Sequence, residues 1–121
     1  MSILDRGILE PIVERLVMEF EPEEIHLFGS WAWGEPGSDI DLLVIVAESD
    51  EHPARRARRA YRCLKGVGVP VDVLVKTRAE VDRFRGVKAS LEYKILEQGK
   101  VLYERRSQTG IGGPVAAESP A

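Results

Sequence analysis

Two aspartates one residue apart, Asp39 and Asp41, stand at the start of a long aliphatic run. If that run is a β-strand, its side chains alternate between the two faces, so both carboxylates point the same way. Like charges held so close repel one another unless a cation lies between them. Just upstream, Gly29 and Ser30 form a turn whose backbone N–H groups could receive an anion. A cation site beside an anion site is what a metal-bound nucleoside triphosphate requires.

A third carboxylate, Asp72, is the one charged residue in the aliphatic stretch 69–75. If this stretch pairs with the strand that contains Asp41, Asp72 can face the same cleft. Three carboxylates around two Mg²⁺ ions about 4 Å apart would form a two-metal site for phosphoryl transfer. Mg²⁺ suits such a set because it prefers hard oxygen ligands and completes its octahedron with substrate phosphates.

A simpler interpretation of the same residues exists. Asp39 could cap the loop after Ser38, and Asp41 could be solvated at a strand edge. A charged residue within an aliphatic strand needs a partner, however, and Asp72 is such a residue. We therefore predict that Asp39, Asp41 and Asp72 are catalytic residues and metal ligands.

The elements that must position these residues alternate between helix and strand. Apolar residues recur at helical spacing up to Phe20, and Pro11 predicts that this helix begins near the proline or kinks there. Thr77, followed three residues later by Glu80, is the pattern of a capping box at a helix start. We expect strands at 24–28, 40–46, 71–75 and 101–103, a short helical turn after Gly29, and helices at 54–65, from 78 onward and at 89–98. The alternation predicts an α/β layer architecture.

The composition indicates one globular domain. Of the 121 residues, 44% are hydrophobic and 31% are charged, as is usual for a globular protein. We expect this domain to span residues 1–106, followed by a disordered tail at 107–121 that is poor in large apolar residues. No apolar run approaches the roughly 20 residues that span a bilayer, no signal peptide is evident, and Cys63 has no second cysteine to pair with. A cytoplasmic protein without a membrane partner is the expectation.

The formal net charge of −3 argues against a generic nucleic-acid-binding protein. The segment 54–62 nevertheless carries five arginines, of which Arg55, Arg58, Arg59 and Arg62 would share one helix face. Two interpretations stay open for this face. It is either solvated, as charged helix faces usually are, or it docks an acidic partner or RNA.

The Gly-Ser turn, the Asp-x-Asp pair and the later strand aspartate together resemble the signature of the polymerase-beta-type nucleotidyltransferase superfamily. Residues 8–103 as a whole are similar to the minimal nucleotidyltransferases, also called MNT proteins, and the closing segment 96–104 looks like the end of that family. The resemblance implies a nucleotidyltransferase fold of the α/β (α+β) class. Such a fold has a short mixed β-sheet of about four strands flanked by helices.

The resemblance also implies roles for individual residues. Gly29 and Ser30 would bind the triphosphate, Asp39 and Asp41 the metal ions, and Asp72 the second metal ion and the attacking group.

The chain departs from the family pattern at two points. The spacer of eight residues between Ser30 and Asp39 is shorter than is common. Trp31 and Trp33 stand where many relatives carry at least one arginine. These tryptophans either pack within the short helical turn or, in one case, stack on a base.

The activity that the resemblance implies is transfer of a nucleoside monophosphate, AMP from ATP in the first instance, to a hydroxyl group. The implied cofactor is Mg²⁺, with two ions, and the substrate is ATP or another nucleoside triphosphate. Minimal nucleotidyltransferases are commonly antitoxins of HEPN-domain toxins, so a HEPN-domain protein is the expected partner and acceptor, and a homodimer is a further assembly to consider. The alternative hypothesis is a non-catalytic nucleotide- or protein-binding module that neutralises its partner by contact.

Overall fold

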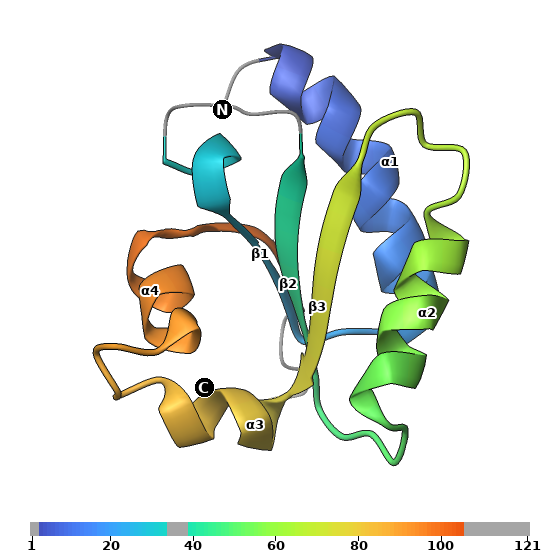
Figure 1. Cartoon of the computed structure of the whole chain (residues 1–121). Coiled ribbons are helices and arrows are strands. Elements are labelled where there is room, and N and C mark those ends of the chain that lie inside the picture. Colours follow the sequence, from blue (N-terminus) through green and yellow to red (C-terminus); the bar gives the residue numbers. More distant parts are fainter. Residues whose placement is uncertain (1–2, 34–38, 106–121) are drawn as a thin grey trace, which may run out of the picture.

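The structure of the chain, a computed structural model, describes residues 3–33 and 39–105. Its elements are α1 (Ile3–Phe20), β1 (Glu24–Phe28), the short helical turn η1 (Gly29–Trp31), β2 (Ile40–Val46), α2 (Pro53–Cys63), β3 (Val71–Thr77), α3 (Arg78–Phe84), α4 (Leu91–Gln98) and β4 (Lys100–Glu104) (Figure 1). The expected α+β architecture is confirmed. The tail predicted at 107–121 lies outside the described residues.

The four strands form one mixed sheet in the order β3-β2-β1-β4. Strand β2 runs parallel to β3 and antiparallel to β1, and β1 is also antiparallel to β4. The end of β1 therefore lies beside the starts of β2 and β3. This edge of the sheet is where the sequence places its glycine–serine turn and its strand aspartates.

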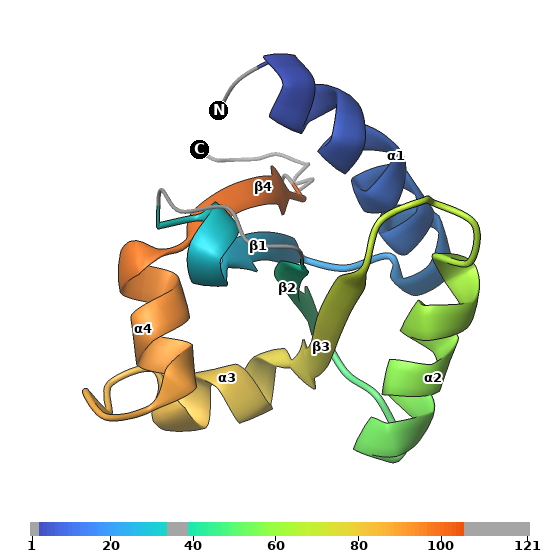
Figure 2. The same ribbon diagram turned by 45° about the horizontal axis from the view of Figure 1, so that its top comes forward.

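Helices cover both faces of the sheet. Figures 1 and 2 show α1 and α2 on one side and α3 and α4 on the other. Leu42 and Val44 of β2 belong to the core on the α1 side, whereas Leu43 and Ile45 pack with Val81 and Ile95 from α3 and α4. Burial on both faces explains the near-continuous aliphatic sequence of β2. None of the helices in the described part of the chain is long and apolar enough to cross a membrane.

Helix α1 differs from the prediction at Pro11. A helix start at this residue is wrong, since α1 begins at Ile3 and contains the proline. Leu9 and Ile12, on either side of it, are only 2% and 1% exposed. Their burial against the sheet offsets the cost of a proline within a helix, which is about 3 kcal/mol.

The other boundaries differ by a few residues. Helix α2 ends at Cys63 rather than at residue 65, and β3 continues to Thr77. Helix α4 begins after Ser90, whose hydroxyl accepts a hydrogen bond from the Tyr93 N–H at 3.0 Å. The predicted capping box at the start of α3 is confirmed, with its two hydrogen bonds at 3.1 and 2.9 Å between Thr77 and Glu80.

Candidate active site

The candidate active site lies at the sheet edge where β1 ends and β2 and β3 begin. Asp41 is the register partner of Phe28 on β1 and of Asp72 on β3. Neighbouring strands lie about 4.8 Å apart, and register partners of parallel strands project to the same face. Asp41 alternates with Ile40 and Leu42, so it lies on the sheet face that α3 and α4 cover. The structure thus places Asp72 directly beside Asp41.

Asp39 precedes β2 and is exposed, as is Asp72, whereas Asp41 is half-buried between them. The Ile40 N–H donates a hydrogen bond to the Pro70 carbonyl at 3.0 Å, which joins the starts of the two strands. Burial raises the pKa of Asp41 above its usual range, and the negative charges of Asp72 and Asp39 raise it further. The three carboxylates are therefore electrostatically coupled, with Asp41 in the middle.

Gly29 packs directly against the Asp41 carboxylate. Its φ of +76° lies in the left-handed region, and a β-carbon at this position would collide with Asp41 Oδ2. The turn closes on Gly29, because its carbonyl accepts hydrogen bonds from the N–H groups of Ala32 and Trp33 at 3.0 and 3.1 Å. Ser30, half-buried, follows immediately. The glycine–serine turn and the carboxylates thus form one continuous site.

The carboxylates fit magnesium by their chemistry. Among the residues that the structure describes, no three His, Cys, Asp or Glu side chains form a group that could hold one metal ion. A magnesium ion needs only one or two carboxylates, because substrate phosphates and water supply its other ligands. The repulsion that raises the pKa of Asp41 is what a divalent cation beside Asp39, Asp41 and Asp72 would relieve.

The two tryptophans of the spacer differ in their surroundings. Trp31 is half-buried and packs against the hydrophobic core, as one of the two interpretations expects. Trp33 is 39% exposed, and the Lys94 ammonium from α4 lies 4.1 Å from the centre of its ring. Nothing in the local sequence around Lys94 predicts this contact, because it joins two segments far apart in the chain.

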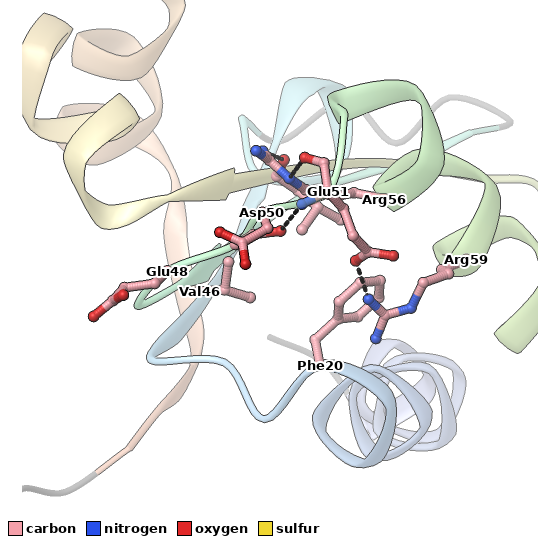
Figure 3. A pocket seen from close by; sticks show the side chains of 9 residues that line it. Phe20, Val46, Glu48, Asp50, Glu51, Arg56 and Arg59 are labelled. Carbon is pink, nitrogen blue, oxygen red and sulfur yellow. Dashed lines mark hydrogen bonds and ion pairs between the residues drawn. The ribbon is translucent and has the colours of Figure 1, made fainter.

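A cavity of about 430 Å³ lies at the opposite end of the sheet, where β2 ends (Figure 3). Arg56 is buried at its wall and binds the Val75 carbonyl and both carboxylate oxygens of Glu80, the latter at 2.9 and 3.2 Å. Val46, which lines the cavity, is the last residue of β2, whereas Asp41 lies at the start of this strand. The cavity is therefore separate from the aspartates.

The five arginines of α2 differ in their surroundings, and only Arg56 is buried. Arg59 pairs with Glu19 and Glu51, and its guanidinium lies 4.6 Å from the centre of the Phe20 ring. The side chains of Arg55, Arg58 and Arg62 are exposed. Arg59 is only half-buried, and its carboxylate partners lie on α1 and in the loop before α2. Whether the exposed arginines are solvated or dock a partner stays a prediction.

Comparison with known proteins agrees with this geometry. A family model described as a nucleotidyltransferase domain matches residues 9–102, so the chain belongs to the nucleotidyltransferase domain family. None of the curated proteins compared with the chain matches it.

The solved structures similar to the chain include two that are at least 25% identical to it. One is a protein from Sulfolobus solfataricus assigned as a nucleotidyltransferase, with 25% identity, a TM-score of 0.59, and coverage of 82% of this chain and 79% of that one. The other is from a mutant form of the toxin–antitoxin complex MntA–HpeT, with 26% identity, a TM-score of 0.56, and coverage of 79% and 72%. The expected nucleotidyltransferase class is confirmed.

Proposed function

We propose that this protein transfers a nucleoside monophosphate, AMP from ATP, to a hydroxyl group of a partner protein. The observation that carries the proposal is the register of Asp41 with Asp72, with Gly29 packed against the Asp41 carboxylate. The arrangement combines carboxylate ligands with a turn that can approach phosphate closely. Membership of the nucleotidyltransferase domain family supports the reaction class.

Each residue has a role in this reaction. Asp39, Asp41 and Asp72 would hold two Mg²⁺ ions, which would neutralise triphosphate charge and lower the pKa of a bound hydroxyl. The backbone of Gly29 and Ser30 positions the triphosphate. Asp72 orients the acceptor hydroxyl and assists removal of its proton. A bond forms between the acceptor oxygen and the α-phosphorus, the bond from that phosphorus to the bridging oxygen breaks, and pyrophosphate leaves.

The partner that we propose is a HEPN-domain toxin, for which this protein would be the antitoxin. Similarity to a structure of the toxin–antitoxin complex MntA–HpeT supports this part of the proposal. A tyrosine of the partner is the hydroxyl that we expect to be modified.

Transfer can be measured by incubating the protein and its partner with Mg²⁺ and ATP labelled at the α-phosphate. The partner should gain label from α-labelled ATP and none from γ-labelled ATP, and the double variant Asp39→Ala, Asp41→Ala should abolish labelling. Asp82→Ala is the matched control, because it removes an exposed carboxylate of α3 that pairs only with Arg85 in the described part of the chain. A double variant that still neutralises the partner without labelling it would instead support neutralisation by contact.

A further inference from the structure

Lys94 contacts Trp33, which follows the glycine–serine turn of the candidate active site, although the two residues are distant in sequence. Its ammonium is 4.1 Å from the centre of the Trp33 ring. The Trp33 N–H in turn donates a hydrogen bond to the carbonyl of Gly29, the residue in contact with Asp41. Figures 1 and 2 show α4, which carries Lys94, on the same side of the sheet as η1. One tryptophan side chain therefore separates the Lys94 ammonium from the glycine–serine turn.

The charge on Lys94 is available to an anion. Two other cations on this side of the sheet are paired: Lys76 with Glu92 at 2.6 Å, and Arg78 with Glu23 and Glu24 at 2.9 and 2.8 Å. Within residues 3–33 and 39–105, no carboxylate forms an ion pair with Lys94. Contact with an aromatic ring uses one side of an ammonium, which has three N–H donors in all. Lys94 can therefore donate to a ligand while it stays on the ring.

The helix that carries Lys94 is fixed to the sheet. Ile95, the next residue, is 1% exposed and belongs to the core on the α3 and α4 side. Glu92 is buried and paired with Lys76 of β3. These two anchors restrict the movement of α4, and the Trp33 ring restricts the side chain. A cation that is held in place before binding loses less entropy when it meets its ligand.

We propose that Lys94, packed on Trp33, binds the β- and γ-phosphates of the nucleotide. This inference rests on the proposed function. Transfer requires the α-phosphorus to lie at Asp41 and Asp72. In this proposal the remaining phosphates extend past the Gly29 turn toward Lys94, because the Trp33 N–H bonds to the Gly29 carbonyl and the Lys94 ammonium lies on the Trp33 ring. An ammonium there would complement the negative charge of these phosphates.

Titration with Mg·ATP and with AMP tests the assignment, because AMP lacks both of the phosphates concerned. Lys94→Gln should weaken ATP binding about tenfold or more, the loss expected for one hydrogen bond to a charged group. Its affinity for AMP should change by less than about twofold, and Lys94→Arg should restore most of the ATP affinity. Lys88→Gln is the matched control, an exposed lysine in the segment between α3 and α4.

The outcomes separate this inference from the proposed function. Equal weakening of ATP and AMP binding by Lys94→Gln, or no weakening of either, would overturn the role of Lys94 alone. A wild-type protein that binds no nucleotide with Mg²⁺ would overturn both.

A double-mutant cycle with Trp33→Leu adds a second criterion. If Trp33 acts by holding Lys94, Trp33→Leu should weaken ATP binding in the wild type and have little further effect in Lys94→Gln. Additive effects of the two substitutions would contradict the proposed pairing.

Discussion

A β-carbon on residue 29 would occupy the space that the Asp41 carboxylate fills. The glycine also has a φ of +76°, which residues with a side chain rarely adopt. Gly29 is thus required twice, once by its own backbone and once by the carboxylate beside it. This contact ties the turn after β1 to the start of β2.

Gly29→Ala should separate these two requirements when it is compared with Gly66→Ala. Gly66 has a φ of +88° but open space around its missing β-carbon, so its substitution strains the backbone alone. Both variants should lower the free energy of unfolding by about 1–3 kcal/mol. Only Gly29→Ala should also displace Asp41 and abolish nucleotide binding. Chemical denaturation and an ATP titration measure the two effects, and retained binding in Gly29→Ala would show that the contact is dispensable.

Asp41→Asn should change how stability depends on pH. Burial and the neighbouring charges of Asp72 and Asp39 raise the pKa of Asp41 in the folded chain. The group therefore favours folding most below the unfolded pKa of about 3.9, and this contribution is lost as pH rises through the raised folded pKa.

Asn cannot ionise, so Asp41→Asn should be more stable than the wild type at pH 7 without metal. The difference should disappear below about pH 3.9, where the wild-type carboxyl is protonated in both states. Thermal unfolding across this range measures the difference. A variant that is less stable than the wild type at pH 7 would contradict the repulsion among these carboxylates.

Glu80→Gln should destabilise the fold without affecting the candidate active site. Gln can keep the capping box with Thr77, but it removes the negative charge opposite the buried Arg56 guanidinium. We expect a loss of about 1–3 kcal/mol in the free energy of unfolding. Arg85→Gln, at an exposed ion pair, should cost less than about 0.5 kcal/mol. Similar losses for the two variants would show that burial of Arg56 does not increase the contribution of its ion pair to the free energy of unfolding.

The contribution of Glu80 to the free energy of unfolding depends on pH with the opposite sign to that of Asp41. The hydrogen bond from Arg56 is the main cause that lowers the pKa of Glu80 below its usual range. The stability that it contributes is present above the unfolded pKa of about 4.3 and is lost as pH falls through the folded pKa. The difference between wild type and Glu80→Gln should therefore shrink in acid, as denaturation at several pH values would show.

Local signals in the sequence were sufficient for much of the fold. Strand β2 was predicted from its aliphatic run, and the start of α3 from Thr77 and Glu80, because burial on two faces and a capping box each leave a contiguous pattern. Asp72 was recognised as a candidate because a charge within an apolar strand is unusual. Its exact neighbour could not be inferred, since the register of two parallel strands depends on long-range packing.

Contacts between distant segments account for what the sequence did not predict. The start of α1 before Pro11 depends on burial against the sheet. The ion pair between Arg56 and Glu80 and the contact between Lys94 and Trp33 each join elements that are remote in the chain. Periodicity and turn residues report only on neighbours in sequence, so such pairs require the structure.

Calorimetric titration of ATP into the wild type and Asp41→Asn, with Mg²⁺ and with a chelator, tests the carboxylate site most directly. If Asp39, Asp41 and Asp72 hold a metal-bound nucleotide, the wild type should bind ATP with Mg²⁺ and lose that affinity in the chelator. Asp41→Asn should bind Mg·ATP at least about tenfold more weakly than the wild type, since one metal ligand is lost. Equal affinity of Asp41→Asn and the wild type for Mg·ATP would contradict the assignment of this site.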